Sequence, residues 1–152
     1  MEIPQLEFVC EIMVIVGKPQ EIGDVGIGTR KIIPLLGGEF KGPAIQGKVL
    51  DGGFDWQLIK HNGIADVDAR YVLETDDGVL IYLSNKGLRI ASENVLQQLA
   101  NGEKVDAGKY YFRTVPSFET SGDKYKWLMQ SVFIAKGIRN PDNVVIQVWK
   151  VL

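Results

Sequence analysis

The sequence predicts an all-β protein: a single antiparallel meander β-barrel of about eight to ten strands, with one short helix near residues 93–100. Short runs rich in Val, Ile, Tyr, Phe and Trp are separated by 17 glycines and 6 prolines, which is typical of antiparallel strands. Tight-turn signals such as Asn62-Gly63 join many of these runs directly. Because open sheet edges invite aggregation, we expect the last strand to close the barrel against the first.

The first strand is expected over residues 6–16, where apolar side chains of one parity face the core and Glu7 and Glu11 face the other way. The next three strands are expected over residues 26–38, 42–50 and 54–59. We expect Gly37-Gly38 to end the second strand. Asp51-Gly52-Gly53 predicts a tight hairpin turn before the fourth.

The second half continues the meander with three strands, one helix and three further strands. Asn62-Gly63 and Asp76-Asp77-Gly78 predict hairpin turns, and Asn85-Lys86-Gly87 predicts a third. Ser92 can cap the helix at its N-terminus, and Gly102 can end it. The expected strands of this half cover residues 68–75, 79–85, 88–92, 109–120, 125–138 and 143–152.

Composition limits the classes of function. The 17 basic and 19 acidic side chains nearly cancel without a basic stripe, so no nucleic-acid partner is predicted. No apolar run approaches the length of a spanning helix, so no membrane partner is predicted, and the acidic N-terminal residues do not resemble a secretory signal. The single Cys10 excludes an intrachain disulfide and favours a cytoplasmic location. Length and the absence of a linker indicate one domain over residues 1–152.

Motifs for cofactor and metal chemistry are missing from the chain. The only histidine, His61, lies in a predicted turn, and one histidine with one cysteine cannot build a zinc site. The glycines of residues 23–28 precede a strand rather than a helix, so they do not predict a dinucleotide site. The sequence therefore predicts no cofactor and no metal.

Charged residues lie close in sequence to aromatic ones on several expected strands. Aromatic side chains with a few convergent polar groups are the usual lining of a small-molecule pocket. Asp55 and Trp56 are adjacent on one strand, so they cannot both point directly inward unless a bulge turns them. An exposed strand face or an internal ion pair is the alternative interpretation of each charge.

Five segments of the chain resemble a bacterial and fungal family known as domain of unknown function 3237, or uncharacterised protein family 0311. They read GGEFKGP (37–43), GGFDW (52–56), TDDG (75–78), FRTVPSFET (112–120) and WL (127–128). The resemblance implies a single antiparallel, calycin-like barrel with an additional helix, and no settled activity. Position 129 departs from the family, which usually has Asn there; Met129 makes a site less polar or simply fills space. The residues of this chain that match the family pattern are Arg30, Gly37, Gly38, Gly42, Gly47, Asp55, Trp56, Tyr71, Asp77, Gly78, Arg113, Phe118, Glu119, Trp127 and Leu128.

Three hypotheses for function follow from a barrel wide enough for one small ligand. In the first, a small aromatic or carbonyl- or carboxylate-bearing molecule undergoes proton transfer, as in an isomerase, cyclase or lyase, with Asp55 or Glu119 as general acid or base. Its binding residues would be Arg30, Trp56, Tyr71, Arg113, Phe118, Trp127 and Met129. In the second, the same pocket belongs to a carrier or sensor without catalysis. In the third, these residues only close the barrel. A homodimer is compatible with all three.

Overall fold

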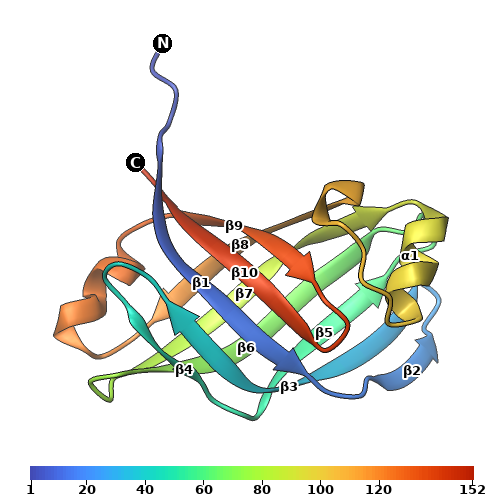
Figure 1. Ribbon diagram of the computed structural model, residues 1–152, viewed down its shortest axis with the longest axis horizontal. Helices are drawn as coiled ribbons and strands as arrows, with labels where there is room; N and C mark the ends of the chain where they lie inside the picture. The colour runs from blue at the N-terminus through green and yellow to red at the C-terminus, as the bar shows by residue number, and fades with distance from the viewer.

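A computed structural model describes residues 1–152. The protein is a barrel of antiparallel strands. Figure 1 shows α1 (Glu93–Ala100) beside one end of the barrel, with the segment that contains the 3-10 helix η2 (Asp123–Met129) beyond the opposite end. A second 3-10 helix, η1, covers Ala107–Lys109. The strands are β1 (Leu6–Val16), β2 (Gln20–Asp24), β3 (Thr29–Lys41), β4 (Gln46–Val49), β5 (Gly53–Ile59), β6 (Ala65–Thr75), β7 (Leu80–Ala91), β8 (Tyr110–Glu119), β9 (Phe133–Arg139) and β10 (Asn143–Val151).

The barrel closes as expected, between the first and last strands. β1 pairs with β10 along one side, for example Ile12 with Ile146, and with β3 along the other, where Val14 lies opposite Gly38. The closed ring has eight strands, β2 and β4 being additional to it. Because every strand of the ring has two neighbours, no long edge is left unpaired.

One predicted hairpin is wrong. β4 and β5 both run antiparallel to β3, with Val49 opposite Gly38 and Gly53 opposite Leu35. The chain therefore keeps its direction between β4 and β5, and the residues between them form an irregularity in one interrupted strand. Gly52 has a φ of +106° there, which a glycine adopts without strain.

Two other glycine-containing segments were predicted to end a strand, but the structure continues the strand through each of them. β3 continues through Gly37-Gly38, and β7 continues through Asn85-Lys86-Gly87. A Cβ on Gly38 would lie 1.9 Å from the carbonyl oxygen of Met13, and one on Gly87 would lie 2.1 Å from that of Arg113. These glycines let neighbouring strands approach closely, which is the second common use of glycine in a strand.

The helix prediction is confirmed: α1 covers Glu93–Ala100, and the backbone N–H of Val95 donates to the Ser92 hydroxyl at 3.3 Å. The strand predicted over residues 125–138 is only partly correct. Its first part is η2, in which Tyr125 and Leu128 are buried three residues apart, the period of a 3-10 helix. Tyr125 Oη donates to Asp77 Oδ1 at 2.6 Å, and this contact holds η2 against the turn between β6 and β7.

The two ends of the barrel interior differ in polarity. Near η2 the interior is filled by aromatic and aliphatic side chains, among them Leu128 and the rings of Phe118 and Phe133, which pack edge to face at 5.1 Å. Elsewhere in the interior polar groups, described below, enter from β5, β6, β7 and β9. No helix of the structure has the length and apolar character that a membrane crossing needs.

Candidate functional site

An internal cavity of about 50 Å³ lies inside the barrel and is lined by all eight strands of the closed ring. This volume is enough for a few water molecules. The lining consists of Val14, Val16, Ile33, Leu35, Asp55, Gln57, Val67, Ala69, Tyr71, Asn85, Arg89, Phe112, Arg139, Val144 and Ile146.

The polar wall of the cavity follows from strand register. Asp55 on β5 pairs with Ala69 on β6, which pairs with Asn85 on β7, so the three lie in one row across the sheet. Because Ala69 has a minimal side chain, the carboxyl and amide on either side of it face a shared space. Gln57 and Arg89 follow on β5 and β7 with the same parity, so they point to the same interior.

Asp55 is the buried carboxyl of this wall, with 8% of its surface exposed. Its Oδ1 accepts from the backbone N–H of Asp68 at 3.0 Å, and its Oδ2 accepts from Gln57 Nε2 at 3.3 Å. Desolvation raises the pKa of Asp55 from 3.8 to about 6, although these hydrogen bonds and the charge of Arg89 act in the opposite direction. The carboxyl can therefore exchange a proton near neutral pH.

Arg89 is a buried guanidinium that forms no ion pair, although its charge and that of Asp55 attract each other across the cavity. It is 8% exposed, its Nε has no hydrogen-bond partner, and none of the ion pairs in the structure includes it. Burial lowers the pKa of Arg89, and repulsion from Arg139 adds to this effect. Arg139 is half-buried and donates through Nη1 to the backbone oxygens of Asn140 and Asn143. Two guanidinium groups and one carboxyl thus share the cavity.

Two further lining residues carry buried polar atoms without partners: the hydroxyl of Tyr71 and Oδ1 of Asn85. Burial raises the pKa of Tyr71, so its hydroxyl is a proton donor at neutral pH. Unpaired buried polar atoms are unfavourable unless a water or ligand supplies the missing hydrogen bond.

The opposite wall is apolar. Val14 of β1 and Val144 and Ile146 of β10 form it, and the ring of Phe112 closes one side. Gly137 leaves room for this ring, since a Cβ there would lie 2.4 Å from it. The half-buried lining residues mark the side on which the cavity approaches solvent; they are Val16, Ile33, Arg139 and Val144. The cavity can therefore hold a molecule with one polar end and one apolar end.

Four of the sequence-predicted site residues lie inside the barrel or at its closed end. Asp55 and Tyr71 line the cavity. Phe118 is buried in the apolar part of the interior, and Trp127 is half-buried on η2, where its ring lies 6.2 Å from that of Phe133. Phe118 and Trp127 thus support the barrel without lining the cavity.

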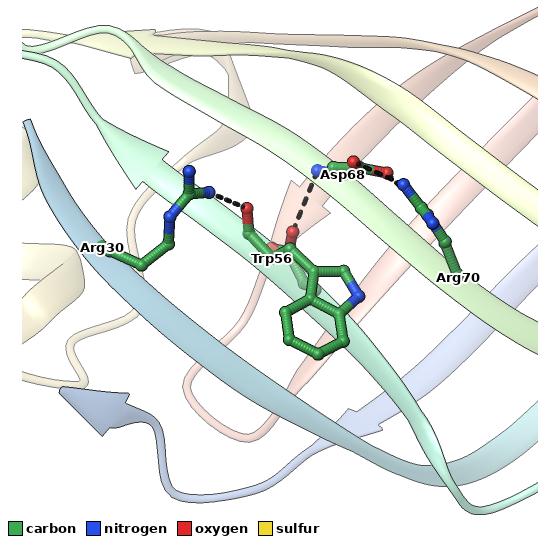
Figure 2. A network of polar contacts seen from close by, with 5 residues as sticks. Arg30, Trp56, Asp68 and Arg70 are labelled. Carbon is green, nitrogen blue, oxygen red and sulfur yellow. Dashed lines mark hydrogen bonds and ion pairs between the residues drawn. The ribbon is translucent and has the colours of Figure 1, made fainter. Parts of the chain in front are cut away.

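The other five predicted residues lie away from the cavity. Figure 2 shows Arg30 donating to the backbone oxygen of Trp56 at 2.8 Å, while Trp56 itself is 40% exposed. Arg113 is exposed and lies over the ring of Tyr111 at 5.1 Å. Glu119 and Met129 are also exposed. Asp55 contacts neither Arg30 nor Arg113, because alternation along the strands directs these arginines outward.

The cavity contains four polar residues that were not among the predicted site residues: Gln57, Asn85, Arg89 and Arg139. The Asn-Lys-Gly sequence predicts a turn at Asn85 and a new strand that contains Arg89. The alternation along the chain instead indicates one continuous strand with a buried face. Its buried residues are Ile81, Leu83, Asn85 and Arg89. The structure contains no cluster of three or more His, Cys, Asp or Glu side chains that could hold a metal ion.

The fold and cavity define a class: closed antiparallel β-barrels with a partly polar interior. The chain belongs to the family described as "Protein of unknown function (DUF3237)", whose model matches residues 4–151. It is 46% identical over 146 residues to a UPF0311 protein of Bradyrhizobium diazoefficiens, covering 96% of this chain and 95% of the relative. A UPF0311 protein of Clostridium acetobutylicum is 40% identical, with 95% and 92% covered.

Solved structures share the barrel. A conserved protein of unknown function from Rhodopseudomonas palustris has a TM-score of 0.95 at 41% identity, with 100% of both chains covered. A protein described as beta-barrel like, from Acinetobacter baumannii, has a TM-score of 0.87 at 40% identity, covering 100% of this chain and 98% of the other. An enzyme from Penicillium herquei has a TM-score of 0.74 at 20% identity, with 98% and 95% covered, and so shares the fold alone.

Proposed function

We propose that the barrel interior binds a small organic molecule that is aromatic or carries a carbonyl or carboxylate group, and that Asp55 transfers a proton to or from it. The observation that carries this proposal is the position of Asp55: a buried carboxyl with a pKa of about 6 on the wall of a cavity. A group with such a pKa is present in both protonation states near neutrality, which suits a general acid or base.

The chemistry that fits this wall is proton transfer beside a carbonyl group. The Asp55 carboxylate removes a proton from the carbon next to the carbonyl, and the electron pair of the C–H bond moves to the carbonyl oxygen. Arg89 and the Tyr71 hydroxyl are the donors available to stabilise the resulting enolate oxygen. Return of the proton from Asp55 to another atom completes an isomerisation, and expulsion of a neighbouring group completes an elimination. Neither route needs an oxidant or reductant.

The test measures hydrogen–deuterium exchange in D2O at the carbon next to the carbonyl, by proton NMR, over a panel of small ketones and carboxylic acids. We expect the wild-type protein to accelerate exchange for some of the panel, and Asp55→Asn to lower that rate by about 10²- to 10⁴-fold. Glu119→Gln is the matched control, because it neutralises an exposed carboxyl outside the cavity. Exchange that survives Asp55→Asn at the wild-type rate would exclude this role.

A carrier or sensor is the second candidate function. It is favoured by the position of Glu119 outside the cavity, which leaves Asp55 as the only carboxyl in the lining. In that case a panel compound raises the melting temperature by mass action, while no proton exchange is accelerated. A purely structural barrel predicts neither effect; the unpartnered polar atoms of the cavity argue against it.

A further inference from the structure

We infer that the ligand of the cavity is a compact organic carboxylate, anchored by Arg89 with its apolar part against the wall formed by Val14, Val144 and Ile146. This inference rests on the proposed function, since it names the chemical class that the same cavity takes. It assigns the anchoring role to Arg89, in place of Arg30 and Arg113.

The first argument is the state of Arg89 in the ligand-free protein. A buried charge is retained in proteins when it is paired or hydrogen-bonded. Arg89 is 8% exposed, takes part in no ion pair, and its Nε–H has no acceptor. Its planar fork of donors is the group best matched to a carboxylate, which accepts two parallel hydrogen bonds from it.

The second argument is that the protein's own carboxyl does not fill this role. Both oxygens of Asp55 already accept hydrogen bonds, from the Asp68 backbone and from Gln57. Arg89 and Arg139 outnumber Asp55, the one carboxyl of the lining, so the cavity carries an excess of positive charge whether or not Asp55 is ionised. An anionic ligand would balance this charge, whereas a cation would increase it.

The third argument comes from the remaining lining. The Tyr71 hydroxyl is an unpartnered donor, and so it can add a hydrogen bond to a carboxylate oxygen. The opposite wall offers only aliphatic groups and the Phe112 ring. With about 50 Å³ available, the carboxylate belongs to a small molecule, or to the end of a larger one that extends past the half-buried residues Val16 and Arg139.

The experiment compares two isosteric pairs, butyrate with butyramide and benzoate with benzamide, as probes of the full-length protein. Binding is followed by NMR, through the side-chain N–H signals of Arg89 and Asn85. We expect each carboxylate to bind at least tenfold more tightly than its amide, with the Arg89 Nε–H signal shifting most. Equal affinity of a carboxylate and its amide, with both shifting the cavity signals, would overturn the inference and leave the proposed function intact. Failure of all four probes and of the wider panel to bind would count against both.

Substitutions of Arg89 test whether its guanidinium binds the carboxylate. Arg89→Gln should abolish the preference for carboxylates, and Arg89→Lys should retain part of it, because the charge remains while the fork is lost. Arg113→Gln is the matched control and should bind as the wild type does, since Arg113 is exposed outside the cavity. Preference retained in Arg89→Gln would exclude Arg89 as the anchor.

The stability of ligand-free Arg89→Gln separates an anchor from a structural role. At about pH 5 Asp55 is largely neutral, so Arg89 has no anion to attract. Its guanidinium should then not stabilise the free protein, and the melting temperature of Arg89→Gln at this pH should be unchanged or raised. A lower melting temperature, or failure to fold, would mean that Arg89 supports the barrel. In that event Arg139→Gln, which should weaken carboxylate binding more than amide binding, and the wild-type comparison decide the ligand class.

Discussion

Two opposing effects set the pKa of Asp55. Removal from water favours the neutral acid, while the N–H of Asp68, the amide of Gln57 and the charge of Arg89 favour the carboxylate. Desolvation is the larger effect, so the pKa is raised to about 6. The neighbouring Trp56 shares none of this environment, because it lies on the outer face of the same strand.

The raised pKa predicts how stability depends on pH. Between about pH 4 and pH 6 the folded protein retains a proton on Asp55 that the unfolded chain releases. The free energy of unfolding should therefore fall as pH rises through this window, by about 3 kcal/mol for a shift from 3.8 to about 6. Urea unfolding of wild type and Asp55→Asn at several pH values checks this. The free energy of unfolding of wild type minus that of Asp55→Asn should fall across the window, and a constant value would contradict the prediction. Glu119→Gln, which removes an exposed carboxyl, is the control.

Among the elements, the short 3-10 helix η2 packs against one end of the barrel and is joined to the β6–β7 turn. It packs Tyr125 and Leu128 onto the apolar end of the interior, and the Tyr125 hydroxyl donates to Asp77 in the β6–β7 turn. Hydrogen bonds from Thr75, Tyr125 and Lys124 hold the pKa of Asp77 well below its usual range. The turn pair Asp77-Gly78 thus reverses the chain and also anchors η2.

Adjacent substitutions in η2 test its packing role. Leu128→Ala should lower the free energy of unfolding by about 2–5 kcal/mol, because it leaves a cavity under η2. Met129→Ala is the matched control and should change it by no more than about 0.5 kcal/mol, because Met129 is exposed (46%) and does not enter the interior. Urea unfolding measures both. Similar values for the two variants would show that η2 contributes little to the closed end.

For the molecule as a whole, the seam between β1 and β3 completes the ring of strands around the cavity. At this seam Gly38 pairs with Val14 of β1 and with Val49 of β4, at a φ of +145°. Any side chain there would meet the carbonyl oxygen of Met13. The close pairing of β1 with β3 therefore depends on the missing Cβ at Gly38.

Two glycine substitutions separate backbone strain from steric conflict at the seam. Gly38→Ala should lower the free energy of unfolding by about 3 kcal/mol or more, because strain and a clash with the β1 backbone combine. Gly23→Ala should cost about 1–2 kcal/mol, since Gly23 also has a positive φ, +95°, but has no atom near its Cβ position. Equal losses in urea unfolding would show that the clash at Gly38 is relieved without opening the seam.

Much of the fold could be predicted from the sequence, and less of the site. Strand positions, the turn at Asn62-Gly63 and the cap at Ser92 depend on residues close together in the chain, so local patterns were sufficient. Glycine signals within strands were misinterpreted at Gly38 and Gly87, where the cause is a neighbouring strand distant in sequence. Asp55 and Tyr71 were placed in the lining by the combination of acid and aromatic residues, whereas Arg89 was not.

Local sequence patterns were enough to predict a closed antiparallel meander, because alternation and turn chemistry are properties of a few consecutive residues. Which polar residues share the interior followed from the pairing of the strands. Strand register sets Asp55, Ala69 and Asn85 in one row and directs Arg89 inward, while Arg30 and Arg113 face out. The physical reason is that burial of a side chain depends on the strands that pair around it, and pairing joins residues far apart in the chain.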